Sequence, residues 1–322
     1  MKAIVYERFG PPEVLEPREL PKPVPGDREV LIKVRATTVT AGDWRCRSRI
    51  VPKGFGFAAG LFLGFSKPRH PILGSELSGE IEAIGKDVTR FKVGDPVFAF
   101  SDTSMGSYVE YKCVPEDGAL ARKPSNLSHE EAAALSFGGT TMLGFFRKAG
   151  IREGDRVLVN GASGGVGTAA VQLATHFGAR VTGVCSTANL ELVKSLGADA
   201  VIDYTRDDFA RNGETYDLIV DTAGTAPFSR CKGSLREGGR LLEVLGSVPD
   251  MLRAPWVSMT TGKRIIAGSP PWGEDALRLL ASLAESGRFK PLIDRSYPVE
   301  RIVEAHRYVD MGHKRGNVVI TW

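Results

Sequence analysis

The amino-acid sequence predicts two domains of different class, an all-β domain followed by an α/β domain with a doubly wound parallel sheet. The first observation is a change near residue 125, where short strand-like segments give way to alternating strand-like and helix-like segments. Such alternation is typical of a parallel sheet with helices on both faces. The second is a glycine-rich turn between an apolar run and an amphipathic stretch. The third is the length of 322 residues, which fits two domains.

The first domain is expected to be a compact, barrel-like β structure. Its strand candidates are separated by Pro11 and Pro12, by Pro21–Pro25, and by Gly85 and Gly94, all of which favour turns. The candidates lie at 3–6, 29–35, 77–84, 95–100 and 107–112.

The second domain is expected to carry the parallel sheet. Its strands are predicted at 156–160, 180–185, 199–203, 217–221, 239–245 and 263–268. A last helix at 299–311 and a strand at 317–321 are expected to return to the β domain. The predicted boundaries are therefore 1–125 with a C-terminal return at 290–322 for the β domain, and 126–289 for the α/β domain.

The glycine-rich turn has the form of a dinucleotide-binding fingerprint. It follows the apolar run Val157–Val159 and precedes a predicted helix at 168–177. Glycine permits a tight turn and a close approach of the backbone to a pyrophosphate, and the helix N-terminus offers free N–H groups. The alternative is a turn that packs the helix on the sheet and binds nothing. The predicted cofactor contacts in the turn are Gly161, Ala162, Ser163, Gly164, Gly165, Val166 and Gly167.

The residues after the next predicted strand favour NADPH, with NADH as the second choice. Sites for NAD usually carry an acidic residue about 20 positions after the glycines, whereas this chain has Ser186 and Thr187 there. Small hydroxyl residues leave room for a 2′-phosphate and do not repel it. Ala188 and Asn189 are neutral, so the cation for that phosphate would have to be Lys194 or Arg206. For each of these two, a solvated surface charge is the alternative.

Bulk composition is that of an ordinary soluble globular protein, with 42% hydrophobic and 25% charged residues. The net charge of +4 is mild and no Lys/Arg block occurs, so nucleic acid is not an expected partner. No long apolar run predicts a membrane span, and the N-terminus does not resemble a signal peptide. The four cysteines are far apart, which suggests reduced thiols and a cytoplasmic location.

Several further motifs carry a resemblance over nearly the whole chain. They are Met1–Val5, Pro71–Gly79, Gly94–Phe98, Asn160–Gly167, Leu196–Tyr204 and Gly316–Ile320. With these motifs the sequence resembles the zinc-independent quinone oxidoreductase branch of the medium-chain dehydrogenase/reductase superfamily. The resemblance implies a GroES-like β domain, a Rossmann domain, an active site in the cleft between them, and a homodimer formed through the sheet edge near 263–268.

No metal is expected. Zinc-dependent relatives use an early cysteine and a histidine in a Gly-His-Glu motif, whereas this chain has no cysteine at Thr38–Arg45 and has Ser75 in place of the histidine. The third ligand region, Ser136–Thr141, contains neither Cys nor His, and Asp43 and Glu76 alone do not complete a zinc site. The four-cysteine structural lobe of the alcohol dehydrogenases is also missing.

Without a Lewis acid, the better substrates are already electrophilic. Quinones and α,β-unsaturated carbonyls accept hydride at carbon and spread the charge onto oxygen, where hydrogen-bond donors stabilise it. The expected function is therefore NADPH-dependent reduction of a small hydrophobic quinone or other electrophilic carbonyl acceptor. The alternatives are an alkenal or enone reductase and a non-catalytic NADPH-binding member of the family. A zinc alcohol dehydrogenase is opposed by the missing ligands.

The resemblance also implies residue roles. Thr141 corresponds to a threonine beside the nicotinamide, with a helix-start hydroxyl as the alternative. Tyr204 corresponds to a tyrosine near the adenosine phosphate, with a solvated tyrosine at a strand end as the alternative. The family binds the nicotinamide amide through backbone groups at positions that correspond to Leu245, Gly246, Gly268 and Ser269.

Asp43 and Arg45 are the predicted catalytic side chains of the β domain, together with Thr141. Related reductases have an Asn or Asp at this point facing the acceptor, and Asp43 would orient a water or Arg45, which would act as a donor. The alternative is a turn-capping Asp43 beside a solvated Arg45.

Residues 54–66 contain four phenylalanines spaced by glycines. The segment is expected to be a mobile apolar lid over a hydrophobic acceptor pocket or a helix packed into the core. A role at a membrane surface is the least favoured, because the polar face is nearly missing. Trp256, Met259 and Trp272 would add apolar walls to the pocket or belong to the core.

Overall fold

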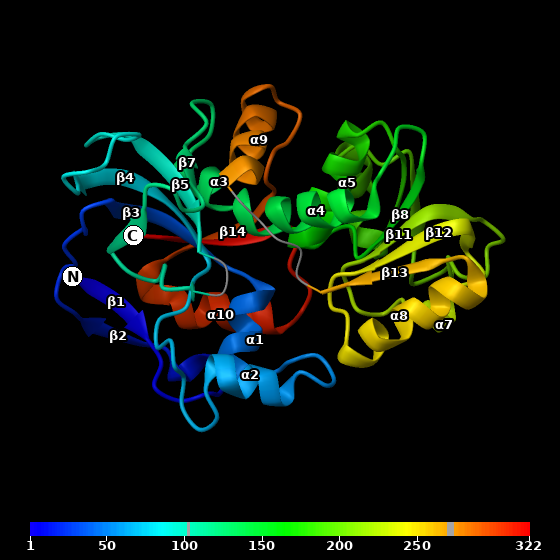
Figure 1. Cartoon of the computed structure of the whole chain (residues 1–322), viewed down its shortest axis with the longest axis horizontal. Coiled ribbons are helices and arrows are strands. Elements are labelled where there is room, and N and C mark those ends of the chain that lie inside the picture. The colour runs from blue at the N-terminus through cyan, green and yellow to red at the C-terminus, as the bar shows by residue number, and fades with distance from the viewer. Residues whose placement is uncertain (102–103, 269–273) are drawn as a thin grey trace. The chain divides into compact units, whose positions relative to one another are not determined.

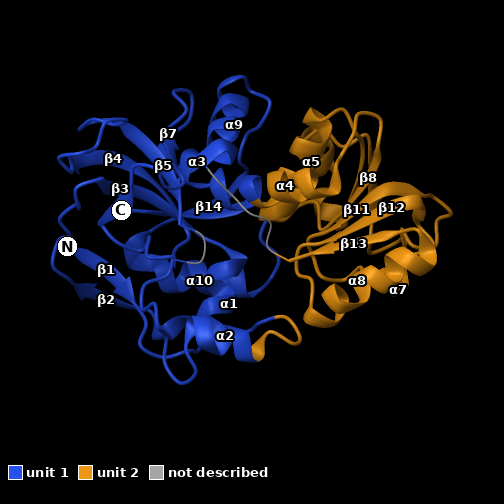
Figure 2. Ribbon diagram, in the orientation of Figure 1, with its two compact units in different colours: residues 1–51, 57–140, 272–322 blue, residues 52–56, 141–271 orange. Residues whose placement is uncertain are grey.

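The computed structural model describes residues 1–101, 104–268 and 274–322, and the chain forms two compact units (Figure 2). Unit 1 consists of residues 1–51, 57–140 and 272–322, and unit 2 consists of residues 52–56 and 141–271. Unit 1 is built mainly on antiparallel strands, with one parallel pair near the C-terminus, and unit 2 on a parallel sheet. The predicted fold class is therefore confirmed.

Unit 1 is organised around a seven-stranded sheet with the order β14-β15-β3-β4-β5-β7, to which β6 adds on β3. Strands β1 and β2 form a separate antiparallel pair. The strands of unit 1 are β1 (Lys2–Val5), β2 (Glu16–Glu19), β3 (Glu29–Val39), β4 (Glu76–Ile84), β5 (Pro96–Phe100), β6 (Tyr111–Pro115), β7 (Leu120–Arg122), β14 (Ile293–Pro298) and β15 (Asn317–Thr321).

Strand β3 is the centre of this sheet, because it pairs with β4, β6 and β15. Its register against β4 shifts between Leu31 and Ile32 and again between Val34 and Ala36. Such irregularities bend and twist a strand, which lets the sheet curl around its own side chains. The enclosed core contains Val30, Ile32, Val34, Leu77, Ile81, Val97 and Leu120.

The chain returns to unit 1 at its C-terminus. Strand β15 pairs antiparallel with β3, and Val319 lies opposite Thr38. The predicted helix at 299–311 is a short 3₁₀ turn at Val299–Arg301 followed by α10 (Ile302–Asp310). The other helices of unit 1 are α1 (Ala41–Ser48), nearly all of α2 (Gly56–Leu63), α3 (His129–Ala133) and α9 (Glu274–Glu285).

Unit 2 contains a six-stranded parallel sheet with the order β10-β9-β8-β11-β12-β13. Its strands are β8 (Arg156–Asn160), β9 (Arg180–Cys185), β10 (Ala200–Asp203), β11 (Tyr216–Asp221), β12 (Leu235–Glu243) and β13 (Arg264–Ala267). All six were predicted, although β12 begins at Leu235 rather than at 239. Within this unit, Figure 1 shows α5 (Gly165–His176) on one side of the sheet and α7 (Phe228–Cys231) and α8 (Val248–Thr261) on the other. Helix α6 (Leu190–Ser195) connects β9 and β10.

The limits of the two compact units differ from the domain limits expected at residues 125 and 290. Helix α4 (Ser136–Ala149) begins in unit 1 and continues in unit 2, because the division falls between residues 140 and 141. Helix α9 belongs to unit 1, where Asn126, between β7 and α3, donates a hydrogen bond to the carbonyl of Ala284, 2.9 Å away. The domain limits at 125 and 290 stay a prediction.

Candidate nucleotide and acceptor sites

The glycine-rich turn of unit 2 connects the buried strand β8 to helix α5. Gly161 has φ +83°, a conformation that L side chains rarely adopt. A Cβ on Gly167 would lie 2.0 Å from the carbonyl oxygen of Gly161, so only glycine fits where the helix crosses the turn. Gly164 precedes α5 without a side-chain cap, which leaves the N–H groups of the first helical turn for an anion. The turn therefore fits a dinucleotide pyrophosphate.

The position of this turn in the sheet supports the same function. Strand β8 has β9 on one side and β11 on the other, so the chain order reverses beside β8. In open α/β sheets, ligands bind outside the carboxyl ends of the strands at this reversal point.

Asp221 fixes the loop next to the glycine-rich turn. Its Oδ1 accepts hydrogen bonds from Asn160 Nδ2 and from the backbone N–H of Gly224, both at 2.9 Å, and its Oδ2 accepts one from the N–H of Ala226 at 2.8 Å. Thr222 Oγ1 donates to the carbonyl of Asn160, 2.8 Å away. The sequence analysis did not single out Asn160 or Asp221. The sequence pattern that could have identified them is a polar residue at the end of each of two apolar strands.

The predicted 2′-phosphate residues meet the glycine-rich turn. Asn189, which follows β9, donates from Nδ2 to the Oγ of Ser163 at 3.3 Å and to the Oγ of Ser186 at 3.1 Å. The Oδ1 of Asn189 is buried and has no hydrogen-bond partner in the described part of the chain. The structure therefore brings Ser163, Ser186 and Asn189 together.

Asp203, the last residue of β10, is a carboxylate near these residues that the sequence analysis missed. It accepts a hydrogen bond from Thr187 Oγ1, and Thr205 donates to it from its backbone N–H at 3.0 Å and from its hydroxyl at 2.7 Å. The bonds from Thr187 and Thr205 lower the pKa of Asp203. The hydroxyl of Thr187 is thus committed to Asp203.

Both candidate cations for the 2′-phosphate are paired with carboxylates. Arg206 Nε lies 3.8 Å from Asp203, and Lys194 Nζ lies 3.7 Å from Glu191. Tyr204, which follows β10, is 58% exposed. The exposed Lys194, Arg206 and Tyr204 therefore fit the alternatives, which were a solvated surface charge for each cation and a solvated tyrosine at a strand end.

The residues predicted for the nicotinamide end follow the last strands of the same parallel sheet. Leu245 and Gly246 follow β12, and a Cβ on Gly246 would lie 2.5 Å from the Cβ of Ala267. Gly268 follows β13 with φ +89°, whereas Ser269 lies outside the described residues. Because all six strands are parallel, these positions lie at the same edge as the glycine-rich turn.

Thr141 and the three residues considered as walls of the acceptor pocket have different environments. Thr141 is buried in α4 and belongs to unit 2. Trp256 and Met259 of α8 are largely exposed, so the interpretation as buried core was wrong for both. The face of α8 that they share points away from the sheet, because only Val257 of this helix is fully buried. Trp272 lies outside the described residues.

Asp43 of unit 1 caps helix α1. Its Oδ2 accepts hydrogen bonds from the backbone N–H and the hydroxyl of Thr40 at 2.8 and 2.6 Å, and its Oδ1 accepts one from the N–H of Gly74 at 2.9 Å. Burial nevertheless raises the pKa of Asp43. The carboxylate is fully buried, and both of its oxygens accept hydrogen bonds. This environment matches the alternative in which Asp43 caps a turn.

Arg45 lies two residues further along α1 and is half-buried. Its guanidinium carbon is 5.4 Å from the centre of the Trp44 ring, and no carboxylate in the described residues lies within 4.0 Å of it. Burial lowers the pKa of Arg45. The residue is thus a partly desolvated cation whose donors remain available to a bound oxygen.

The region where relatives bind zinc is filled here by a buried carboxylate and hydroxyls. Glu76 accepts hydrogen bonds from Thr38 Oγ1 and from the N–H of Phe137, the latter at 2.6 Å, and burial raises its pKa to about 8. The hydroxyls of Ser75 and Ser136 are buried without a partner in the described residues. Over residues 1–101, 104–268 and 274–322, no cluster of three or more His, Cys, Asp or Glu side chains is placed to hold a metal. That the protein works without a metal stays a prediction.

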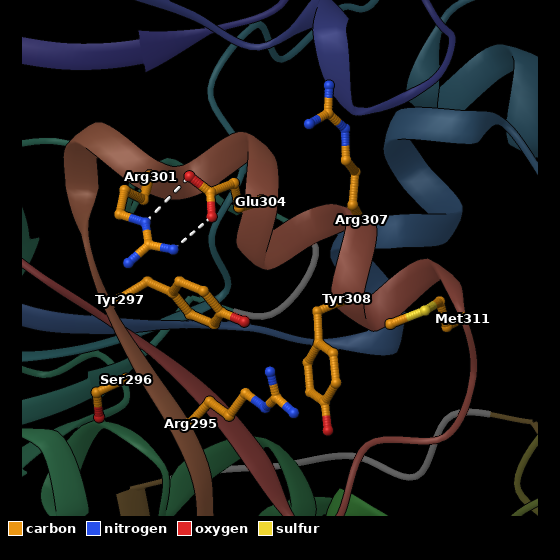
Figure 3. A pocket seen from close by; sticks show the side chains of 8 residues that line it. All are labelled: Arg295, Ser296, Tyr297, Arg301, Glu304, Arg307, Tyr308 and Met311. Carbon is orange, nitrogen blue, oxygen red and sulfur yellow. Dashed lines mark hydrogen bonds and ion pairs between the residues drawn. The ribbon is translucent and has the colours of Figure 1, made fainter.

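A separate surface pocket of about 590 Å³ lies between β14 and α10 of unit 1 (Figure 3). Arg301 of the 3₁₀ turn pairs with Glu304 of α10, and Arg307 points away from the tyrosines and pairs with Glu13. None of the predicted catalytic or cofactor residues lines this pocket, whose lining consists of Arg295, Ser296, Tyr297, Arg301, Glu304, Arg307, Tyr308 and Met311.

Known proteins share both halves of this chain. The model of the alcohol dehydrogenase GroES-like domain matches residues 26–125, and the model named zinc-binding dehydrogenase matches residues 196–320. The 2-methylene-furan-3-one reductase of Solanum lycopersicum is 33% identical over 99% of this chain and 79% of its own length. The chloroplastic NADPH-dependent alkenal/one oxidoreductase of Arabidopsis thaliana is 31% identical over 99% of this chain and 79% of its own length.

A solved structure agrees with these relatives. The quinone oxidoreductase from Coxiella burnetii superimposes with a TM-score of 0.88 at 30% identity, covering 100% of this chain and 99% of the other. Identity at this level over the whole length, together with the shared fold, establishes a common family. The chain therefore belongs to the quinone oxidoreductase branch of the medium-chain dehydrogenase/reductase superfamily, a family of NAD(P)H-dependent oxidoreductases.

Proposed function

We propose that this protein reduces a small hydrophobic, electrophilic acceptor, foremost a quinone, by hydride transfer from NADPH without a metal. The observation that carries the proposal is the turn at Gly161–Gly167, where a Cβ on Gly167 would lie 2.0 Å from a backbone oxygen at the N-terminus of α5. The second candidate acceptor is an alkenal or enone, which is supported by the names of the two curated relatives.

NADPH is preferred over NADH in this proposal because the turn after β9 carries Ser186, Thr187 and Asn189 in place of an acidic residue. The amide nitrogen Nδ2 of Asn189, a hydrogen-bond donor, lies in this turn beside the hydroxyls of Ser163 and Ser186. One relative is named as NADPH-dependent. The negative charge of Asp203 would repel a phosphate bound nearby. That carboxylate already accepts hydrogen bonds from Thr187 and Thr205 and pairs with Arg206, and these contacts reduce the repulsion.

The residues of unit 2 bind and orient the cofactor. When bound, NADPH supplies the hydride. The N–H groups at the start of α5 neutralise the pyrophosphate, while the backbone at Leu245, Gly246 and Gly268 and the side chain of Thr141 fix the nicotinamide ring. This assignment of cofactor contacts is supported by the parallel sheet, in which the positions after β8, β12 and β13 lie at the same edge.

The residues of unit 1 act on the acceptor. Hydride adds to a carbon of the acceptor, the displaced electron pair moves to its oxygen, and that oxygen takes a proton from solvent. Arg45 donates a hydrogen bond to the oxygen as its negative charge develops. Asp43 is a positioning residue, because its capping bonds fix the start of α1 and hence the place of Arg45.

A homodimer formed through β13 also belongs to this proposal. Strand β13 is the edge of the six-stranded sheet and pairs only with β12 in the described part of the chain. An unpaired edge offers backbone donors and acceptors to a second copy.

The decisive experiment is to measure oxidation of NADPH and, separately, of NADH after treatment of the protein with a chelator. Acceptors are a panel of ortho- and para-quinones and alkenals, with simple alcohols and NADP⁺ as the reverse control. Fast NADPH oxidation with quinones and none with alcohols is expected. Faster turnover of alkenals would select the second candidate, and binding of NADPH without turnover of any acceptor would overturn the proposed activity.

A further inference from the structure

Residues 44–75 differ in charge from the rest of the chain. They contain six Lys and Arg residues and no Asp or Glu. Because the whole chain has a net charge of +4, the remaining residues together carry a net charge of −2. Within this stretch, residues 54–66 are uncharged and contain Phe55, Phe57, Phe62 and Phe65.

The structure places most of this apolar segment at the surface. Phe57 is 72% exposed, and Leu61, Phe62 and Phe65 are each between 42% and 49% exposed. Figure 2 shows α2 at the margin of unit 1. These four side chains form what we call the apolar knob. Exposed apolar groups of this size on neighbouring positions are unusual for a surface in contact with water only.

The apolar knob is compact. The rings of Phe57 and Phe65 have centroids 6.0 Å apart, and a Cβ on Gly60 would lie 2.3 Å from the ring of Phe65. The ring of Phe65 therefore folds back over α2, and Gly60 is required for this approach. The core-packed helix expected as one alternative is wrong for these side chains, because in α2 only Gly60 and Leu63 are buried.

Cations flank the apolar knob in the sequence. Lys53 precedes α2, and Lys67 and Arg69 follow it; all three are exposed, and no carboxylate in the described residues lies within 4.0 Å of any of them. Arg49 donates a hydrogen bond to the carbonyl of Phe65 and lies 5.9 Å from the centre of its ring. Positive charge thus lies at the base of the knob and is not neutralised there.

We propose that the apolar knob and its flanking cations dock this protein on an anionic lipid surface. The phenylalanines and Leu61 would enter the headgroup boundary, while Lys53, Lys67 and Arg69 would contact lipid phosphates. No helix in the described residues is both long and apolar enough to cross a bilayer. The proposed attachment is therefore peripheral. The charged groups that accompany the apolar side chains are the cations before and after α2, rather than an opposite face of the same helix.

The proposal concerns binding alone, so it stands or falls independently of the reductase activity. The full-length protein is sedimented with sucrose-loaded vesicles of phosphatidylcholine alone, or of phosphatidylcholine with one quarter phosphatidylglycerol, at 0.05 and 0.5 M NaCl. Expected is co-sedimentation with the anionic vesicles at low salt, a loss of at least tenfold in partitioning at high salt, and weak binding to phosphatidylcholine alone.

Two variants separate the apolar and the electrostatic parts. F57S/F62S is expected to lower partitioning at least tenfold. K67Q/R69Q is expected to lower it about 30-fold, since each cation near the surface contributes about a fivefold factor. Matched controls are V24S/V93S, which alters two exposed valines elsewhere, and K92Q/R152Q, which removes two exposed cations elsewhere. Both controls are expected to bind like the wild type, and thermal unfolding checks that every variant folds.

Three outcomes would overturn the proposal. The first is wild-type protein that stays in the supernatant with anionic vesicles. The second is wild-type binding by both F57S/F62S and K67Q/R69Q. The third is a dimer in analytical ultracentrifugation that F57S/F62S dissociates without any vesicle binding by the wild type, because the knob would then be a contact between copies.

Discussion

Asn189 donates a hydrogen bond from its Nδ2 to the Oγ of Ser163, 3.3 Å away, and so joins the turn after β9 to the glycine-rich turn after β8. The Oδ1 of the same amide is buried without a partner in the described residues. The amide is therefore satisfied at its nitrogen only.

Replacing Asn189 by lysine is expected to strengthen the preference for NADPH. A cation at this point would pair with the 2′-phosphate, and charge-assisted hydrogen bonds contribute about 1.5–3 kcal/mol. The KM for NADPH should fall about tenfold, while that for NADH should change little. The control N212K adds the same charge at an exposed residue of unit 2. Equal changes for both cofactors would show that Asn189 does not face the phosphate.

Two glycine variants test the nucleotide cradle. In G167A the new Cβ would lie 2.0 Å from the carbonyl oxygen of Gly161, whereas in G164A it would lie 3.6 Å from the same atom, an ordinary contact. G167A is expected to lower both the melting temperature and the NADPH affinity. G164A should keep the melting temperature and lose affinity at least tenfold, because the methyl group displaces the pyrophosphate. Full affinity in G164A would contradict binding at this turn. Thermal unfolding and fluorescence titration with NADPH provide the measurements.

Substitution of Arg45 tests its role toward the acceptor. R45Q is expected to lower kcat 10- to 100-fold and to leave the dissociation constant of NADPH unchanged, since the residue belongs to unit 1 and acts on the developing negative charge. R45K should retain part of the activity because it keeps a positive charge. The control R8Q removes an exposed cation of the same unit. A kcat for R45Q equal to that of the wild type would assign Arg45 to surface charge only.

The buried Glu243 at the end of β12 is expected to make stability depend on pH. Burial and the neighbouring Asp250 and Asp221 raise its pKa to about 7. Between the unfolded value of 4.5 and about 7, the unfolded chain loses the proton and the folded chain keeps it, so the free energy of unfolding falls as pH rises.

The comparison of E243Q with the wild type isolates this effect. The variant should gain about 2.5 kcal/mol relative to the wild type between pH 5 and 8, because most of the effect of a pKa shift from 4.5 to about 7 develops in this range and one pKa unit corresponds to about 1.4 kcal/mol. Urea denaturation at pH 5, 6, 7 and 8 measures it. E237Q, at an exposed position of the same strand, should follow the wild type. A constant difference between E243Q and the wild type over this range would show that Glu243 does not titrate there.

Removal of metals is expected to leave turnover unchanged. The residues that correspond to the zinc ligands include Ser75, and Glu76 is held by Thr38 and Phe137. Dialysis against a chelator followed by elemental analysis and an NADPH–quinone assay provides the test. One zinc ion per chain that survives dialysis and whose loss abolishes turnover would contradict the prediction.

The regular elements of unit 2 and its cradle could be predicted because their signals are local. An apolar run makes β8, the glycines make the turn, and an amphipathic stretch makes α5, so each depends on residues close in sequence. The start of β12 was missed because Gly238 and Gly239 interrupt the strand pattern. Leu235 joins the sheet through its pairing with Tyr216 of β11, and the register shifts before Arg240 pairs with Leu218.

The sequence by itself determined the two fold classes, the parallel strands and the place of the nucleotide turn. Only the tertiary structure decided that the carboxylate of Asp43 also binds the N–H of Gly74, that Asp203 accepts a hydrogen bond from Thr187, and that Trp256 and the apolar knob are exposed. Backbone conformation follows from near neighbours, through side-chain periodicity and turn chemistry. Burial and hydrogen-bond partners depend on residues 16 to 31 positions away or more, as between Thr187 and Asp203 or Asp43 and Gly74, and no local pattern specifies them.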